Sequence, residues 1–398
     1  MPRLVVLCLS LFLVLPGLVL AAPVSIGETT TLQSKILDEE RQLMISLPPR
    51  YDATTARYPV LYLLDPSGRF HHTTGTLSAL ARTGHVPEMI VVGVVNTDRT
   101  RDLTPAWTGE PLEDENDGRN QAIAAGGGAD TFLRFLAEEL IPHVESTYRT
   151  VDYRLFAGHS FGGLFAMHAF VHQPELFDAV VSISPSLWWD HGRLVDETAE
   201  LFKTRPDLDS VLYTTLADEG GDMVAQFRRL QTLLRYHAPE DLAWHAEVLD
   251  GEDHSTIPMP TVYSAARFIY PRWQLPPTGT DGGLEAIDGH YARLSDDYGY
   301  SIPTPEATVN QAGYQALGTG EVERALEIFK ANVERHPGSS NVYDSLGEAL
   351  EAAGHLEEAL SHYEKALAMA EAAGGDDPNL PFYQQHAEAV REKIEAAD

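Results

Sequence analysis

A serine flanked by glycines is the strongest chemical signal in this sequence. Residues 158–162 read Gly-His-Ser-Phe-Gly, the pattern G-x-S-x-G, between a short apolar segment and a helical pattern at 161–172. A sharp strand-to-helix turn lifts the central hydroxyl above a sheet edge, and glycines at 158 and 162 avoid a clash with a Cβ. Ser160 is therefore the candidate nucleophile, and the N–H of Phe161 a candidate oxyanion donor. The alternative is a glycine-rich turn whose serine only caps a helix.

A serine hydroxyl needs a base to take its proton. In chains with this turn the order is serine, acid, histidine, each after its own strand. His254 follows the predicted strand 242–249, the last of the series, and is the candidate base; otherwise it is a surface loop histidine. Asp218 and Glu219 both follow the predicted strand 211–216 and leave the acid open. Glu219 is slightly favoured because the glycines behind it leave room for the longer side chain to turn inward.

Further candidates follow the neighbouring strands. Pro66 has no N–H, so Ser67 is the expected second oxyanion donor, or Gly68 if the turn is shifted. Trp188 and Trp189 follow the predicted strand 179–183, where they either line an acyl pocket or pack in the core. Arg99 follows the predicted strand 89–95, where it either holds a substrate carboxylate or fixes its loop. The sequence has no spacing typical of a metal site, so we expect neither a metal nor a cofactor.

Apolar runs alternate with helical patterns over residues 42–273, which predicts an α/β fold with a mostly parallel sheet covered on both faces. Segment 99–128 fits neither pattern and is either a flap or a solvated excursion. The predicted strands span 42–47, 59–64, 89–95, 154–157, 179–183, 211–216 and 242–249, and the predicted helices 130–147, 161–172 and 261–270.

The C-terminal region has a different pattern. Residues 274–305 are rich in proline and glycine and predict a linker. Beyond them, a small–small–aromatic set recurs after 34 residues and resembles the tetratricopeptide repeat, with a capping helix near 381–397. About two repeats are fewer than the three usually needed, so residues 306–398 should lean on the catalytic domain, on a protein partner or on a second copy. The recurring residues are Gly313, Ala325 and Phe329, then Gly347, Ala359 and Tyr363.

Composition narrows the function further. The 398 residues include 28 Lys+Arg and 59 Asp+Glu, a net charge of −31, which argues against nucleic acid as a partner. Cys8 is the only cysteine, and it lies in an apolar run that ends in small residues. Residues 1–22 therefore predict a signal peptide, with an uncleaved anchor as the alternative. We expect an exported protein, periplasmic or secreted, without a membrane span in its mature form and with a catalytic domain at 23–273.

Several segments resemble the esterase family of α/β-hydrolases that includes esterase D, feruloyl esterases, siderophore esterases and mycolyltransferases. They are YPVLYLLDPSGRF, the VVN-DRTRD segment, GHSFGGLFA, SISPSLWWD and the GEDH loop. The resemblance covers roughly residues 28–272 and is nearest to the bacterial siderophore-esterase branch. It implies an α/β-hydrolase fold with Ser160 as nucleophile, His254 as base, and Ser67 and Phe161 as oxyanion donors. Pro66 stands where that family often has glycine, and some siderophore esterases work with a serine–histidine dyad alone.

These observations predict a serine hydrolase that acts on a small-molecule carboxylic ester through an acyl-enzyme. Two alternatives stay open. An acyltransferase of the same fold would use the same acyl-enzyme, and a catalytically weak scaffold would recruit a protein partner through its repeats.

Overall fold

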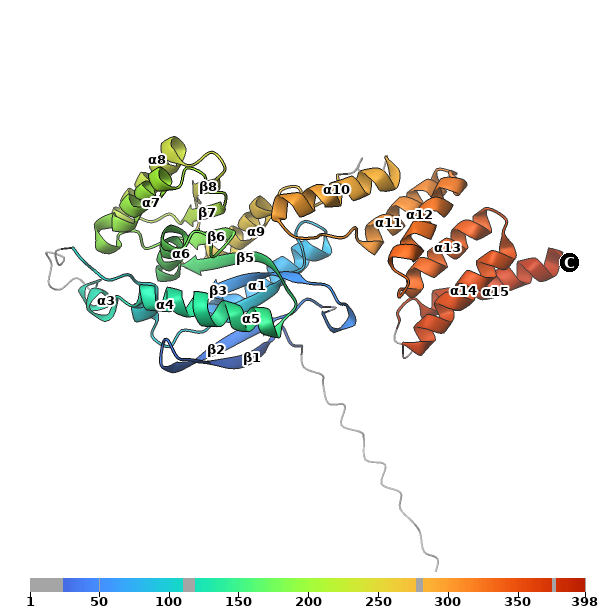
Figure 1. The fold of residues 1–398 in the computed structure, drawn as a ribbon, viewed down its shortest axis with the longest axis horizontal. Coiled ribbons are helices and arrows are strands. Elements are labelled where there is room, and N and C mark those ends of the chain that lie inside the picture. The colour runs from blue at the N-terminus through green and yellow to red at the C-terminus, as the bar shows by residue number, and fades with distance from the viewer. Residues whose placement is uncertain (1–23, 50, 110–118, 277–281, 374–376, 398) are drawn as a thin grey trace, which may run out of the picture.

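An eight-stranded sheet organises the N-terminal part of the described residues (Figure 1). The computed structural model describes residues 24–49, 51–109, 119–276, 282–373 and 377–397, so the predicted signal peptide lies outside the described residues. The strands are β1 (Glu28–Ser34), β2 (Glu39–Ser46), β3 (Tyr58–Leu64), β4 (Ile90–Val94), β5 (Thr150–His159), β6 (Ala179–Ile183), β7 (Val211–Leu216) and β8 (Ala243–Val248).

The strand order is β1-β2-β4-β3-β5-β6-β7-β8, with β2 antiparallel to β1 and β4 and every other pair parallel. The predicted α/β architecture with a mostly parallel sheet is confirmed. β6 and β7 have the predicted bounds. The sequence analysis missed β1 because this edge strand is polar and mostly exposed, without an apolar run.

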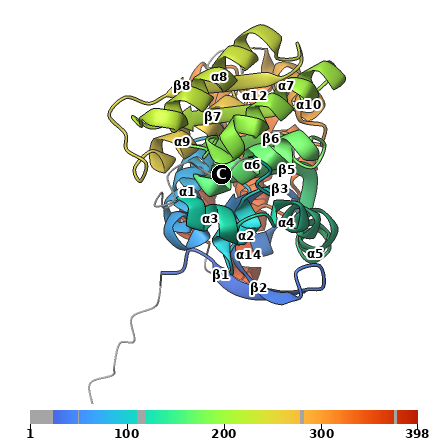
Figure 2. The same ribbon diagram turned by 90° about the vertical axis from the view of Figure 1, so that its left-hand side faces the viewer.

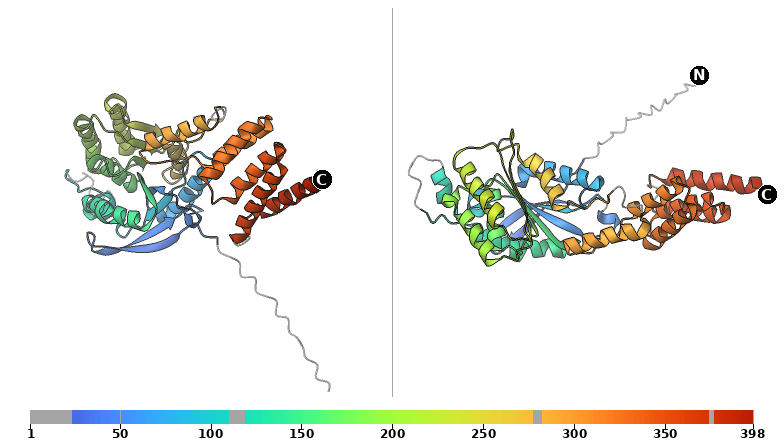
Figure 3. Two further views of the ribbon diagram at one scale, coloured as in Figure 1. Left: turned by 45° about the vertical axis from the view of Figure 1, so that its right-hand side comes forward. Right: turned by 90° about the horizontal axis from the view of Figure 1, so that it is seen from above.

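Helices cover both faces of the sheet, which Figure 3 shows edge-on. Side chains alternate along β3, so Tyr62 and Leu64 pack on one face and Leu61 and Leu63 on the other. The first face is covered by α4 (Ala129–Phe135), η2 (Leu136–Leu140), α5 (Ile141–Thr147), α6 (Phe161–His172), α7 (Arg193–Thr204) and α8 (Gly221–His237), and the second by α1 (Pro66–Arg82) and α9 (Pro258–Ile269). Shorter helices are η1 (Tyr51–Ala53), α2 (Arg99–Leu103), α3 (Arg119–Ala125) and η3 (Trp189–Gly192).

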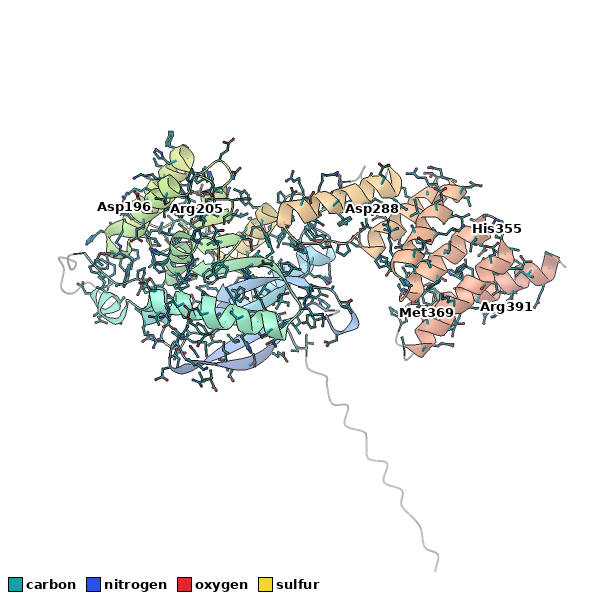
Figure 4. The ribbon with its side chains drawn as sticks, in the orientation of Figure 1. Asp196, Arg205, Asp288, His355, Met369 and Arg391 are labelled. Atoms are coloured by element: carbon teal, nitrogen blue, oxygen red, sulfur yellow. The ribbon has the colours of Figure 1, made fainter. Side chains whose placement is uncertain are left out.

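The predicted linker contains a helix, α10 (Gly283–Tyr298). Ile287, Tyr291 and Leu294 are buried at helical spacing and pack with the C-terminal helices. Asp288 of α10, labelled in Figure 4, accepts from both terminal nitrogens of Arg335. The linker prediction for 274–305 is therefore wrong over 283–298. The flanking prolines and glycines end the helix but do not interrupt it.

The C-terminal helices pair as the repeat predicts: α11 (Glu306–Gly318) with α12 (Val322–Arg335), and α13 (Ser340–Ala352) with α14 (Leu356–Ala372). The predicted capping helix is α15 (Leu380–Ala397), which packs on α14. A Cβ at Gly313 would lie 2.5 Å from the ring of Phe329, and one at Gly347 would lie 2.6 Å from the ring of Tyr363. The small residues therefore allow each helix pair to approach closely.

An aromatic cluster joins the repeats to the catalytic region. Tyr298 at the end of α10 packs on Tyr153 of β5 and on Tyr270, and its hydroxyl donates to the carbonyl of Ile269. Trp273 contacts both Tyr270 and Tyr298. The repeat array thus leans on the catalytic region through α10, and it lies behind that region when the molecule is viewed along its long axis (Figure 2). Among the described residues, no helix has both the length and the apolar character to cross a membrane.

Gly347→Ala tests the close helix approach. The ring of Tyr363 is fully buried and its hydroxyl is held by Glu351, so it has little room to move away from a new methyl group. We expect a loss of roughly 1–3 kcal/mol in unfolding free energy, partly offset by a helix-propensity gain of up to ~1 kcal/mol. Hydrogen exchange of α13 and α14 amides is the measurement.

Gly318→Ala is the matched control, because a Cβ at the end of α11 would meet open space. Its stability should stay the same or rise. Equal losses in the two variants would contradict the packing argument.

Candidate active site

The turn between β5 and α6 holds Ser160 in a strained conformation, with φ 62° and ψ −117°. A Cβ at Gly158 would collide with the carbonyl of Gly162, and a Cβ at Gly163 would lie 2.7 Å from the carbonyl oxygen of Ile183. The expected clash at Gly162 is milder, since its nearest neighbour, a carboxylate oxygen of Asp65, would be 3.2 Å away. Glycines 158 and 163 thus make the sharp turn and the close helix packing possible.

Backbone hydrogen bonds fix the serine in this conformation. The N–H of Ser160 donates to the carbonyl of Ile183 at 2.9 Å, at the end of β6. The carbonyl of Ser160 accepts from Leu164 at 2.9 Å and from Ser186 at 3.1 Å. Both backbone groups of the residue are therefore used, and the side chain is left to line the surface hollows around it.

The structure brings Glu219, rather than Asp218, to the candidate base. Nδ1 of His254 is hydrogen-bonded to Oε1 of Glu219, whose side chain is mostly buried. Asp218 is exposed, and its N–H donates to the carbonyl of Glu252. The hydrogen bond between Glu219 and Nδ1 of His254 fixes the imidazole ring, so that Nε2 is the nitrogen left for the serine.

Two helix N-termini meet at Ser160. Phe161 is the first residue of α6, and Ser67 is the second residue of α1, so neither N–H has a partner within its helix. Pro66 fits beside β4 because residue 93 is glycine, where a Cβ would lie 2.5 Å from the proline ring. Both amides therefore remain candidate oxyanion donors.

Two hollows border the serine, and Ser160 and His254 line both. The first, the aromatic hollow, has a volume of about 390 Å³ and is also lined by Phe161, Ser186, Trp188, Glu219, Gly220 and Met223. The second, the polar hollow, has a volume of about 540 Å³ and is also lined by Asp65, Ser67, Gly68, Arg69, Asn96, Arg99, His159 and Ser255. A third hollow of about 560 Å³, between β2 and α1, contains no candidate catalytic residue. Ser160 therefore borders two chemically different surroundings, one mainly aromatic and one mainly polar.

The side chains of Trp188 and Trp189 lie in different surroundings. Trp188 lines the aromatic hollow, and the guanidinium of Arg119 lies 5.2 Å from its ring. Trp189 is buried, donates from Nε1 to the carbonyl of Pro105 at 3.0 Å, and packs edge-on against Trp107. The substrate-binding prediction for Trp189 is wrong because its indole holds the loop before α3 in the core.

Arg99 holds its loop. Nε and Nη2 donate to the two carboxylate oxygens of Asp65 at 2.8 Å each, and Nη2 also donates to the carbonyl of His159 at 3.2 Å. These bonds tie α2 to the N-terminus of α1 and to the serine turn. Of the predicted flap, residues 110–118 lie outside the described residues, while the parts on either side form α2 and α3.

Sequence reasoning missed Arg69 and His159. Nη2 of Arg69 lies 2.6 Å from Nδ1 of His159, whose ring lies 4.4 Å from that of His254. Burial, together with the charges of Arg69 and His254, lowers the pKa of His159 to about 3. Burial alone would raise the pKa of Asp65, but the hydrogen bonds and charge of Arg99 hold it below the usual range. The only available signal for Arg69 was its place four residues after Asp65.

The helical repeats contain the group of described residues that could hold a metal ion: Asp344, Glu348 and His386 each offer a ligand atom, all within 4.8 Å of one another. Nδ1 of His386 lies 2.9 Å from a carboxylate oxygen of Asp344, an ion pair that accounts for this proximity. The group shares no residue with the hollows at Ser160.

The lowered pKa of His159 makes stability depend on pH. Below the ordinary histidine pKa of about 6.5, the unfolded chain binds a proton there that the folded chain does not bind until about pH 3. Stability should therefore fall as the pH drops from 7 to 4.5, by up to ~1.4 kcal/mol per pH unit from this residue. Urea unfolding at several pH values should show a smaller fall in His159→Gln. His237→Gln, at an exposed residue, is the control. Equal slopes in all three proteins would contradict the assignment.

Comparison with known proteins finds two family models and several relatives that this chain resembles. The model described as "Putative esterase" matches residues 34–221, and a tetratricopeptide repeat model matches residues 321–372. The chain is 36% identical over 160 residues to a siderophore enterobactin esterase from Emericella nidulans (37% of this chain, 52% of that protein). It is 33% identical over 154 residues to the ferri-bacillibactin esterase BesA from Bacillus subtilis (36% of this chain, 53% of that protein).

The alignments thus span about half the length of these curated relatives. A solved IroE-like serine hydrolase from Shewanella oneidensis is similar over 77% of this chain and 99% of its own, with 27% identity and a TM-score of 0.65. Residues 34–221 of this chain are therefore similar to the putative esterase family, and residues 321–372 to tetratricopeptide repeats.

Proposed function

We propose that this protein is a serine hydrolase of carboxylic esters. The observation that supports this most directly is that the strained Ser160 and the Glu219-bound His254 line the same two hollows. Acyl transfer to serine requires a nucleophile, an oriented base and oxyanion donors close to one another. Ser160, His254 and the N-terminal amides of α6 and α1 are the candidates for these parts.

The reaction follows from these parts. His254 accepts the hydroxyl proton while Oγ of Ser160 attacks the ester carbonyl, and Glu219 stabilises the imidazolium that forms. The N–H groups of Phe161 and Ser67 hold the oxyanion, each worth about 2.7–4 kcal/mol in the transition state. His254 then protonates the leaving alcohol, and water releases the acyl group by the reverse sequence.

The relatives bear on the substrate class. One protein similar to this chain is named a siderophore enterobactin esterase, and another a ferri-bacillibactin esterase. We infer that the substrate here is a small-molecule carboxylic ester, and that a panel of esters including a cyclic trilactone is the appropriate screen. Transfer of the acyl group to an alcohol uses the same acyl-enzyme, so product analysis with and without an acceptor alcohol distinguishes hydrolysis from transfer.

The N-terminal apolar run continues to predict export.

Ser160→Ala should lower kcat/KM for a short 4-nitrophenyl ester by at least ~10³-fold, since the covalent step loses its nucleophile. Its thermal melt should stay within a few degrees of wild type. His254→Ala should lose activity to a similar extent. Substantial residual turnover in Ser160→Ala would place the nucleophile elsewhere.

Glu219→Gln and Asp218→Asn form a matched pair. Because the carboxylate of Glu219 contacts His254 while Asp218 is exposed, we expect a loss of at least tenfold in kcat for Glu219→Gln. Asp218→Asn should stay within about twofold. Equal and mild effects would instead favour a serine–histidine dyad, and the reverse order would overturn the geometric assignment.

A further inference from the structure

Among the residues that the structure describes, Arg69 is a half-buried cation that lies beside the candidate nucleophile and forms no ion pair. It lies in the first turn of α1, and its Nη2 contacts a neutral group, Nδ1 of His159. Its Nε is buried and has no hydrogen-bond partner among the residues that the structure describes. Within the described residues, the guanidinium of Arg69 forms no ion pair with a carboxylate. Arg99, in contrast, makes a bidentate contact with Asp65.

The polar hollow therefore has more positive than negative charge. Among the described residues that line it, Asp65 is the one carboxylate, and it already accepts from two nitrogens of Arg99 and from the amide of Asn96. Arg69 adds a second guanidinium without a second carboxylate. In a chain with a net charge of −31, this is a local reversal of sign.

A partly desolvated guanidinium without an ion pair is destabilising, because no contacting carboxylate offsets its lost hydration. Burial lowers the pKa of Arg69, the charge of Asp65 opposes this, and the charge of Arg99 adds a smaller lowering, but arginine stays protonated in proteins. A ligand that brings a carboxylate into the hollow supplies the missing charge and an acceptor for Nε.

We propose that Arg69 makes the polar hollow a subsite for a carboxylate group of the ester substrate. The proposal rests on the proposed function, since Ser160 and His254 line this hollow and set where the ester carbonyl lies. The other end of the ester enters the aromatic hollow, between Phe161 and Trp188. The preferred substrate is thus an ester with an anionic end and an apolar or aromatic end.

Two matched ester pairs test this and show which end carries the charge. The first is the 4-nitrophenyl monoester of glutaric acid against its methyl-capped form, with the charge in the acyl part. The second is the butyrate ester of 3-hydroxybenzoic acid against that of 3-hydroxybenzamide, with the charge in the alcohol part. In at least one pair, wild type should prefer the anionic ester in kcat/KM, and Arg69→Gln should lower that ratio at least tenfold. Arg69→Lys should retain part of it, because lysine keeps the charge but not the fork.

Arg228→Gln removes one exposed positive charge from α8 and is the control. It should keep the wild-type ratio. The proposal is overturned if wild type shows no preference in either pair. It is also overturned if Arg69→Gln slows both members of a pair equally, because that would make Arg69 a positioning residue for His159.

A binding experiment separates failure of the subsite proposal from failure of the proposed function. If wild type hydrolyses none of the four esters, titration of Ser160→Ala with glutarate still tests the subsite. The Kd should rise at least tenfold when Arg69→Gln is added to Ser160→Ala. An unchanged Kd would overturn the proposal on its own.

Discussion

The turn between β5 and α6 depends on one strained residue, Ser160, whose conformation is maintained by its surroundings. A non-glycine residue at φ 62° and ψ −117° costs of order 1–3 kcal/mol. Ser160 remains there because its N–H and carbonyl are hydrogen-bonded to β6, α6 and the segment after β6. The glycines at 158 and 163 remove the Cβ atoms that would prevent this arrangement. The strain keeps the hydroxyl outside the helix and at the edge of the hollows.

Buried ion pairs position the loops around this turn. Arg41 of β2 is fully buried and is paired with Glu39 and Asp102, and its Nη1 donates to the carbonyl of Val95. It therefore ties α2 to the sheet, while Arg99 ties α2 to Asp65. Removing one partner of such a pair would leave a charge buried and unpaired, so the network resists movement. The polar hollow is thus a preformed site.

The repeats are attached by packing rather than by a flexible connection. The aromatic cluster around Tyr298 buries the start of the C-terminal region against β5 and α9, and α10 continues into the core of α11–α14. With α10 at one end and α15 at the other, the two repeats have a cap on each side. This explains how an array shorter than three repeats is stable in this chain.

The sequence by itself determined the periodic and local features. Apolar runs predicted β6 and β7 at their observed bounds, helix α6 was predicted at 161–172, and the 34-residue recurrence predicted the helix pairs. The turn at Ser160 and the loop of His254 were found because glycine spacing and chain order are local signals. Tertiary structure alone decided contacts between segments far apart in the chain. It placed Glu219 against His254, moved Trp189 into the core, made a helix of residues 283–298 and left Arg69 unpaired. Each of these outcomes depends on which distant groups fill or charge the neighbouring space, and periodicity along one segment does not encode that information.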